Sequence, residues 1–435
     1  MKILIVTKRY SVNEESTDGT GKYVSSLCSS LAKKNKVVVV SRCVDRNKKD
    51  YSTLAQTRGN IRSIKIVKNS HPLLSTLNDP LFFARDNKID GAFEDILLSE
   101  DPDIVHIHHL GNLSYSLIDI VKRHGYPLAI TLHDFAYICN GVFKDMSKPY
   151  SCELTLSSCR ECFRKFYYSR LESYLEYRLG QPFSKLAKIF QVVRNMLKGL
   201  SIEKLYKMRI KYYTDLLKRA DAIIAPSKFV KNTFSGFVPA SKISVIPHGI
   251  DISFVGKLAK ANSKVLRFGY VGGPHTHKGI DVVLQACRWI KNAKLLLFGN
   301  EPFSPVIKRY KEKYARSKNI IFKGVYKSPE TVFNNIDVLI IPSLCGETFS
   351  LALHESLAAK VPVIASRIGV FEEIINNNRN GFLFEAGSAK DLTDKINKIT
   401  ANPGLIAQFI KNIGHVKGLK EHVDELASLY SSLLH

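Results

Sequence analysis

The chain has 435 residues, enough for two or three domains of ordinary size. Its composition, 45% hydrophobic and 24% charged, excludes an intrinsically disordered chain. The 64 Lys and Arg residues outnumber 39 Asp and Glu and give a formal charge of +25, which favours anionic partners such as nucleic acid, anionic lipid or phosphorylated substrates.

The first residues predict a buried strand rather than a targeting segment. Residues 1–7 contain an apolar run of only four residues before Lys8 and Arg9, which is too short for a signal peptide. No apolar run approaches the roughly 18 residues of a membrane-spanning helix. We therefore expect a cytoplasmic protein whose eight cysteines are thiols rather than disulfides.

Short apolar strands alternate with helices along the first half of the chain. The predicted strands are residues 3–6, 37–40, 104–107, 128–132, 222–225 and 243–246, with helices at 21–34 and 117–123. Strands this short and wholly apolar indicate a parallel sheet that is covered by helices on both faces.

A cysteine loop, residues 139–162, interrupts this rhythm. Cys139, Cys152, Cys159 and Cys162 lie in a polar stretch and end in a C-x2-C pair, whose two thiolates suit one zinc ion. Four ordinary thiols explain the same spacing equally well. Any metal bound here would be structural.

A basic helical insertion, residues 163–219, follows the cysteine loop. It holds fourteen basic and four acidic residues, with Tyr and Phe interleaved. One interpretation places it on the inner face of an anionic membrane, as a peripheral anchor whose cations meet lipid headgroups. The other is a solvated basic face that packs its aromatic residues inward.

The second half repeats the alternation. Strands are predicted at residues 265–271, 294–298, 320–322, 338–341, 361–365 and 381–384. We divide the chain into a first domain (1–248), a linker (249–263), a second domain (264–412) and a C-terminal helix (413–435) that packs back on the first domain. The fold class is α/β: two doubly wound, parallel-sheet, Rossmann-like domains that face a central cleft, where ligands bind beyond the carboxyl ends of the strands.

Two carboxylates eight positions apart, Glu347 and Glu355, point most directly to function. Glu347 lies in a Gly-containing loop after the strand at 338–341, and Glu355 lies in the helix that follows. Backbone N–H groups at such a helix start favour phosphate, and carboxylates accept hydrogen bonds from sugar hydroxyls.

This pair resembles the E-x7-E signature of the family 4 (group 1) retaining glycosyltransferases, which have the GT-B fold. Six further segments resemble the family, in the family's order: 18–24, 102–109, 131–134, 225–229, 245–251 and 269–279. The resemblance implies that the first domain binds the acceptor and the second binds a nucleotide diphosphate sugar.

The resemblance also implies roles for single residues. The catalytic residues would be Glu347, at the reacting carbon of the sugar, His133, beside Asp134 at a strand end, and Lys278, on the leaving diphosphate. Glu355 would bind the ribose. The other donor-binding residues would be Gly19, Gly21, Gly273, Thr348, Phe349 and Ser350.

The chain departs from the family at Gly273, where an Arg usually stands five positions before the Lys. Another cation or helix-end amide must then supply that charge. His106, His108 and His109 are interpreted as structural or acceptor-facing, because no carboxylate follows at metal-ligand spacing. No D-x-D motif stands at a convincing strand end, which agrees with a metal-independent reaction, with the nucleotide sugar as donor and no cofactor.

These features predict a retaining hexosyltransferase-type enzyme that moves a sugar from a nucleotide diphosphate sugar to a hydroxyl acceptor. The membrane interpretation makes the acceptor a lipid-linked saccharide, as in cell-surface polysaccharide or lipopolysaccharide assembly. Two alternatives stay open: a nucleotide-sugar epimerase of the GT-B fold and a non-catalytic nucleotide-sugar-binding protein. A nucleic-acid partner is not expected, because no recognition module is visible.

Overall fold

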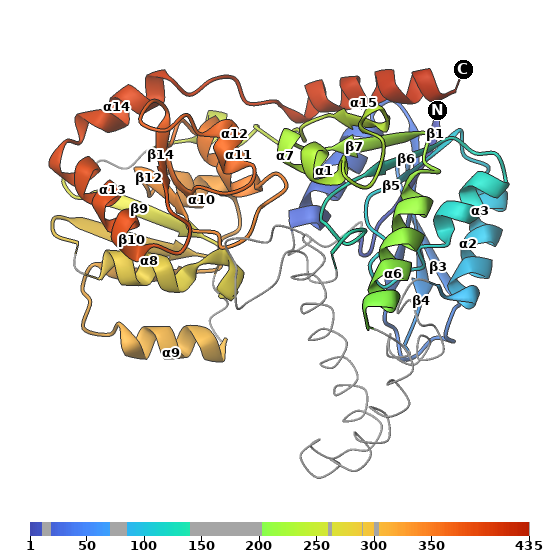
Figure 1. The fold of residues 1–435 in the computed structure, drawn as a ribbon, viewed down its shortest axis with the longest axis horizontal. Coiled ribbons are helices and arrows are strands. Elements are labelled where there is room, and N and C mark those ends of the chain that lie inside the picture. The colour runs from blue at the N-terminus through green and yellow to red at the C-terminus, as the bar shows by residue number, and fades with distance from the viewer. Residues whose placement is uncertain are drawn as a thin grey trace, which may run out of the picture.

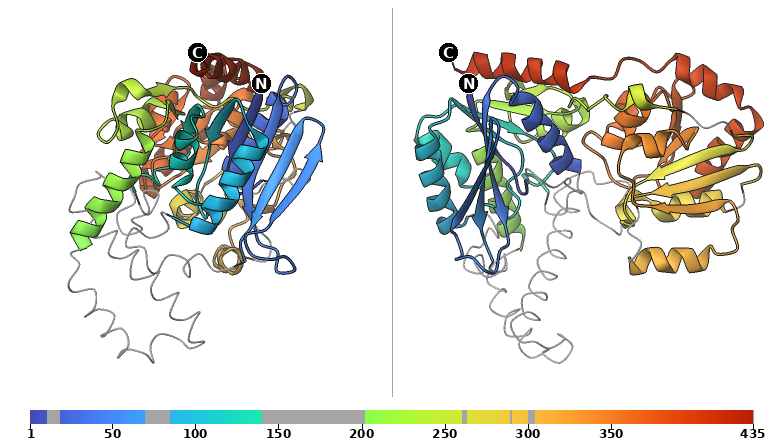
Figure 2. Two further views of the ribbon diagram at one scale, coloured as in Figure 1. Left: turned by 90° about the vertical axis from the view of Figure 1, so that its right-hand side faces the viewer. Right: turned by 180° about the vertical axis from the view of Figure 1, so that it is seen from behind.

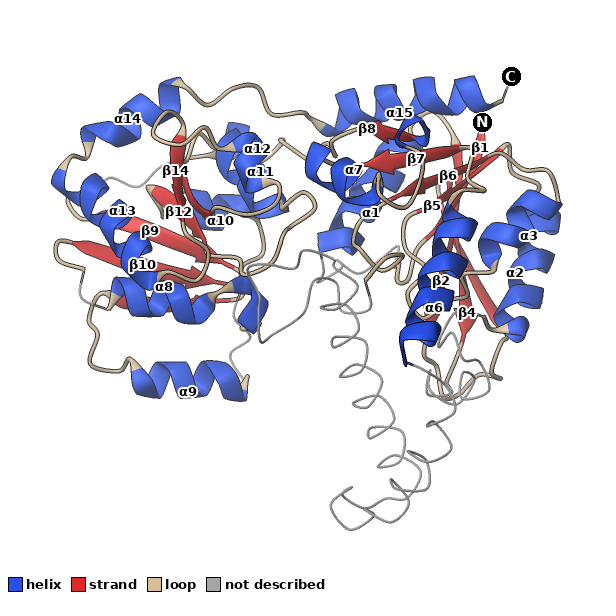
Figure 3. Cartoon of the chain, viewed as in Figure 1, coloured by secondary structure: helices blue, strands red, loops and turns tan. Residues whose placement is uncertain are grey.

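The computed structural model describes residues 1–10, 19–69, 85–139, 202–259, 263–288, 290–299 and 304–434. They form two α/β halves that lie side by side (Figure 1). Each half has a largely parallel sheet with helices on both faces, as the alternation of apolar strands predicted (Figure 3).

The first half is built on an eight-stranded sheet in the order β3-β4-β2-β1-β5-β6-β7-β8. Its strands are β1 Lys2–Val6, β2 Lys36–Cys43, β3 Thr53–Arg58, β4 Ile61–Val67, β5 Ile104–Ile107, β6 Leu128–Thr131, β7 Ala222–Ala225 and β8 Ile243–Val245. All neighbouring pairs are parallel except β3 with β4. The sequence did not predict this antiparallel edge pair.

Successive residues of β1 face opposite cores, because side chains alternate across a strand. Ile3 and Ile5 pack with α1 (Gly19–Leu31) and α15 (Leu419–Leu433). Leu4 and Val6 belong to the other core, with α2 (Asn87–Glu100), α3 (Leu117–Arg123), α6 (Ile202–Leu217) and α7 (Lys228–Phe234). The sheet is therefore buried on both faces.

The second half has six parallel strands in the order β11-β10-β9-β12-β13-β14. These are β9 Leu266–Val271, β10 Ala293–Phe298, β11 Ile320–Gly324, β12 Val338–Ile341, β13 Val363–Ser366 and β14 Gly381–Phe384. The helices are α8 Ile280–Cys287, α9 Pro305–Lys313, α10 Pro329–Phe333, α11 Leu351–Ala358, α12 Phe371–Ile374, α13 Ala389–Ala401 and α14 Gly404–Lys411.

Both sheets have a point where the strand order reverses. In the first half it lies between β1 and β5, and in the second between β9 and β12. In doubly wound sheets, ligands bind beyond the carboxyl ends of the strands at this point. The loops that follow β1, β5, β9 and β12 are therefore the places to look for a site.

The chain crosses between the halves twice, near Ile250 and near Lys417, and the two crossing segments are joined by backbone hydrogen bonds. The Ile250 N–H donates to the Lys417 carbonyl at 3.2 Å, and the Leu419 N–H donates to the Ile250 carbonyl at 3.0 Å. After the second crossing, α15 lies against α1 of the first half (Figure 2). None of the helices in the described ranges is both long and apolar enough to span a membrane.

Candidate active site

Lys278 and Glu347 meet at the strand-order reversal of the second half. Lys278 ends a 3-10 turn, Thr276–Lys278, after β9, and Glu347 lies in the loop after β12. Between the turn and α8, Gly279 has φ +69°, and a Cβ there would lie 1.7 Å from the Pro342 carbonyl oxygen, so only glycine fits. This close approach brings Lys278 Nζ to 2.8 Å from Glu347 Oε1.

Both members of this pair are ionised. Burial disfavours the charged form of Glu347, but the Lys278 ammonium and the Ser343 hydroxyl, which donates to Oε1 at 2.5 Å, outweigh it and lower the pKa of Glu347. Burial likewise disfavours the charged form of Lys278, and Glu347 outweighs it and raises the pKa of Lys278. Glu347 is thus a carboxylate, not a proton donor, and part of the Lys278 charge is already compensated.

The Glu355 carboxyl group has no partner among the residues that the structure describes. Glu355 lies just over one turn into α11, and its side chain makes no hydrogen bond or ion pair with these residues. Burial raises the pKa of Glu355 to about 7, and the nearby Lys22 ammonium opposes that rise. A partly buried carboxyl group with a raised pKa is a candidate functional residue.

Lys22 reaches this place from the first half. It lies on α1, one residue after Gly21, and its Nζ is 5.5 Å from the ring centroid of Tyr326, which follows β11. Gly19, at the start of α1, lies against α11, because a Cβ on Gly19 would be 3.6 Å from Leu351 Cδ1. The starts of α1 and α11 therefore converge beside Glu355.

The segment Thr348–Phe349–Ser350 connects the two halves. Thr348 Oγ1 donates to the His133 carbonyl at 2.9 Å, and Ser227 Oγ donates to the Thr348 carbonyl at 2.8 Å. Ser350 has φ +64°, a strained conformation for serine and of the kind found at functional sites. The Nδ1–H of His354 donates to the Ser350 carbonyl at 3.0 Å.

His133 follows β6 and is neutral. Burial lowers the pKa of His133 to about 3, and its Nε2 lies 2.9 Å from His108 Nδ1. Asp134 pairs with His109 at 3.0 Å instead of with His133. Burial disfavours the charged form of Asp134, but His109 outweighs it and lowers the pKa of Asp134 to about 2.

His106 is fully buried between Thr131 Oγ1 and Tyr430 of α15.

A column of rings that sequence reasoning missed links the halves behind His133. The distances between ring centroids are 3.8 Å from His354 to Phe349, which are stacked, and 4.8 Å from Phe349 to His248. The ring of His248 in turn stacks on Tyr23, with centroids 3.9 Å apart. Tyr23 OH then lies 2.6 Å from His422 Nε2 of α15. The motif segments contained Tyr23, His248 and Phe349, but no spacing signal could pair residues so far apart.

Gly273 stands in the loop after β9, where its carbonyl accepts the Tyr270 hydroxyl at 3.0 Å. Gly21 is buried on α1. Within the described ranges, no group of three or more His, Cys, Asp or Glu side chains is arranged to hold a metal ion. Cys139 precedes a stretch that includes Cys152, Cys159 and Cys162, which lie outside the described residues, as does the basic insertion up to residue 201.

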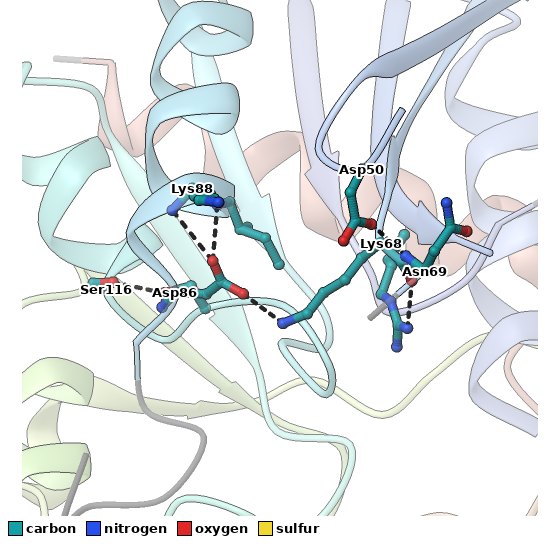
Figure 4. A network of polar contacts seen from close by, with 9 residues as sticks. Asp50, Lys68, Asn69, Asp86, Lys88 and Ser116 are labelled. Carbon is teal, nitrogen blue, oxygen red and sulfur yellow. Dashed lines mark hydrogen bonds and ion pairs between the residues drawn. The ribbon is translucent and has the colours of Figure 1, made fainter. Parts of the chain in front are cut away.

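A second buried polar cluster lies between the end of β4 and the start of α2 (Figure 4). The Lys68 ammonium donates to Asp86 Oδ2, and these side chains are only 4% and 5% exposed. Asp86 Oδ1 accepts the Lys88 and Ile89 N–H groups, each at 3.2 Å, and so caps α2. No motif or spacing in the sequence pointed to this pair.

Two family profiles match the chain. "Glycosyltransferase Family 4" matches residues 17–164 and 195–254, and "Glycosyl transferases group 1" matches residues 257–415. The matches are to glycosyltransferases, which does not favour an epimerase or a non-catalytic binding protein.

Individual proteins agree with these profiles. The chain is 27% identical over 243 residues to the capsular polysaccharide biosynthesis glycosyltransferase CapM of Staphylococcus aureus, covering 49% of this chain and 62% of that protein. It is 26% identical over 206 residues to the lipopolysaccharide 1,2-N-acetylglucosaminetransferase of Salmonella typhimurium, covering 41% and 53%. The chain thus spans between half and two thirds of these curated relatives.

The fold is shared along the full length with a solved structure. The Anabaena protein HepE, in complex with UDP, superposes with a TM-score of 0.65 at 15% identity, covering 99% of this chain and 100% of that one. At this identity the likeness shows the fold alone.

Proposed function

Because this chain belongs to the group 1 glycosyltransferases and has the GT-B fold, we propose that it transfers a sugar from a nucleotide diphosphate sugar to a hydroxyl acceptor. The observation that carries the proposal is the ion pair of Lys278 and Glu347 at the strand-order reversal, with Glu355, whose carboxyl group has no partner among the described residues, in the adjoining helix. Charged groups and an unused acceptor converge where doubly wound sheets bind nucleotides.

Lys278 stabilises the leaving diphosphate in this proposal. When the bond between the sugar and the diphosphate breaks, negative charge develops on the diphosphate oxygen, and a preorganised ammonium offsets it. Glu347 holds Lys278 in position and, as a carboxylate, accepts hydrogen bonds from the donor sugar. The reaction retains the configuration of the sugar and proceeds without a metal ion.

Glu355 binds the ribose of the donor. Its two oxygens are unoccupied by described residues and suit the two ribose hydroxyls. The fold relative HepE is in complex with UDP, which makes uridine diphosphate the first nucleotide to test. His133, being neutral, contributes a hydrogen bond to the sugar rather than a charge.

The acceptor in this proposal is a lipid-linked saccharide at an anionic membrane surface. CapM and the Salmonella enzyme are named for capsular polysaccharide and lipopolysaccharide, which supports an acceptor of that class. The formal charge of +25, with fourteen basic residues in 163–219, supports attraction to anionic lipid.

A nucleotide screen followed by turnover tests the donor. We expect one of UDP, GDP, ADP or dTDP to raise the melting temperature, its sugar conjugate to release nucleotide with a saccharide acceptor, and Glu347→Gln to abolish that release. A protein that no nucleotide stabilises would contradict the proposal.

Vesicle co-sedimentation tests the membrane. Binding is expected to rise with the anionic lipid fraction, to fall with salt, and to weaken when Lys185, Lys188, Arg194 and Lys198 become Glu. Equal recovery in the supernatant with neutral and anionic vesicles at low salt would overturn the membrane part alone.

A further inference from the structure

A carboxylate of the second half holds the first turn of a helix in the first half. Glu373, on α12, accepts the Lys228 N–H at 3.0 Å with Oε2, and it accepts the Phe229 N–H with Oε1. Both donors are in the first turn of α7, where backbone N–H groups lack partners within the helix. Hydrogen bonds to an ionised acceptor are about twice as strong as neutral ones, so a carboxylate holds this turn more firmly than a neutral side chain does.

The same turn also holds the loop of Glu347. Ser227, the N-cap of α7, accepts the Val230 N–H at 3.3 Å and donates through Oγ to the Thr348 carbonyl at 2.8 Å. The Phe229 ring packs on Gly346, where a Cβ would lie 2.6 Å from the ring. Three consecutive residues of the first half thus contact the second half.

On the other side, α12 and the Glu347 loop are packed without space between them. A Cβ on Gly369, just before α12, would lie 2.9 Å from Gly346 Cα and 3.0 Å from the Glu347 nitrogen. The Val370 N–H donates to the Glu347 carbonyl at 3.3 Å. A shift of α12 relative to α7 therefore moves Glu347, because cores and close backbone contacts transmit displacement.

We propose that Glu373 is a positioning residue, which by holding α7 fixes the Glu347 loop relative to the half that binds the acceptor. The proposal rests on the function proposed above. Lys278, Glu347 and Glu355 all come from the second half, and Lys22 of the first half acts on Glu355 through its charge alone, so nucleotide binding does not need an exact placement of the first half. Transfer to an acceptor does need it, since a misplacement of about 1 Å can cost about a hundredfold in rate.

The expected signature separates this role from a purely structural one. Glu373 is exposed, so Glu373→Ala should fold. We expect kcat for transfer to fall at least tenfold, with the nucleotide Kd within twofold of wild type and a larger radius of gyration in X-ray scattering. Glu373→Gln keeps one acceptor oxygen but loses the charge, so its kcat should lie between those of the wild type and Glu373→Ala. Glu372→Ala, the neighbouring exposed carboxylate on α12, is the matched control.

Each outcome decides the matter. A kcat for Glu373→Ala equal to that of Glu372→Ala would overturn the positioning role, and so would parallel losses of nucleotide affinity and kcat. If the wild-type protein binds none of UDP, GDP, ADP and dTDP, the proposed function fails instead. The scattering comparison then still tests the contact, and an unchanged radius in Glu373→Ala refutes it.

Discussion

At the scale of single residues, the site is defined by how its charges are compensated. Lys278 is paired with Glu347, whereas the Glu355 side chain has no ion pair among the described residues, and the nearby Lys22 ammonium opposes the effect of burial only in part. One carboxyl group is therefore locked in the ionised form, and the other titrates close to neutral pH. The two acids of one motif have different chemical states because their neighbours differ.

Replacing Lys278 tests the role of the ion pair that it forms with Glu347. Lys278→Met removes the charge that offsets the leaving diphosphate, and we expect a loss of about 2–4 kcal/mol of transition-state stabilisation, as for other preorganised electrostatic contacts. Steady-state kinetics measures it as kcat/KM. Lys264→Met, at an exposed position, is the control and should stay within twofold of wild type. A loss below tenfold would show that another cation dominates.

The pH dependence of donor binding tests whether Glu355 titrates close to neutral pH. With the pKa of Glu355 at about 7, the ribose-binding carboxylate forms as pH rises, so donor affinity should increase between pH 6 and 8 and then level off. Lys22→Met should move the midpoint to higher pH, and Glu355→Gln should remove the dependence. Calorimetric titration across this range measures all three, and a flat wild-type profile would exclude Glu355 as the ligand.

The stability of the protein without donor should fall as pH rises, whereas donor affinity should increase. A carboxyl pKa that is raised on folding stabilises the empty protein fully below the unfolded value, about 4.3 for Glu, and this contribution is lost as pH rises through about 7. Glu355→Gln should therefore be more stable than wild type at pH 8 and differ less at pH 4.

At the scale of elements, the sequence predicted what local patterns determine. β5, β6 and β7 are short, mostly apolar and fully buried, and each was found where expected. β3 was missed because Thr53–Arg58 is a polar, mostly exposed edge strand without a one-sided pattern. The capping of α7 by Glu373 joins residues 144 and 145 positions apart, and such partners leave no trace in spacing.

The Lys68–Asp86 pair gives an element-scale prediction. Asp86→Ala removes the carboxylate that pairs with the buried Lys68 ammonium and removes the cap of α2, so we expect about 3–5 kcal/mol of destabilisation in urea unfolding. The exposed pair of Lys211 and Asp215 is the comparison, because Asp215→Ala should cost about 1 kcal/mol or less. Equal effects of the two changes would show that burial of the first pair carries no weight.

At the scale of the whole molecule, α15 belongs to the first half although it follows the second in sequence. Leu426 and Tyr430 are fully buried in the core that includes Ile3, Ile5 and Tyr23. The sequence predicted a C-terminal helix at residues 413–435 that packs back on the first domain, and the core that α15 completes begins about 400 residues earlier.

Leu426→Ala tests this assignment. Removing a buried leucine side chain from a core costs about 2–5 kcal/mol, and we expect the loss of hydrogen-exchange protection to be concentrated in α1 and β1. Ser428→Ala, exposed on the same helix, should change the free energy of unfolding by about 0.5 kcal/mol or less. Protection lost mainly from the β9–β14 sheet would contradict the assignment.

The placement of α15 also has a consequence during synthesis. Domains usually fold in the order in which the ribosome makes them, at roughly 5–20 residues per second. Here the first half cannot complete its core until α15 has emerged, some 170 residues after the first crossing, which is a delay of roughly 10–35 s. Throughout that interval the apolar surface of α1 and β1 that α15 later covers is exposed on the nascent chain.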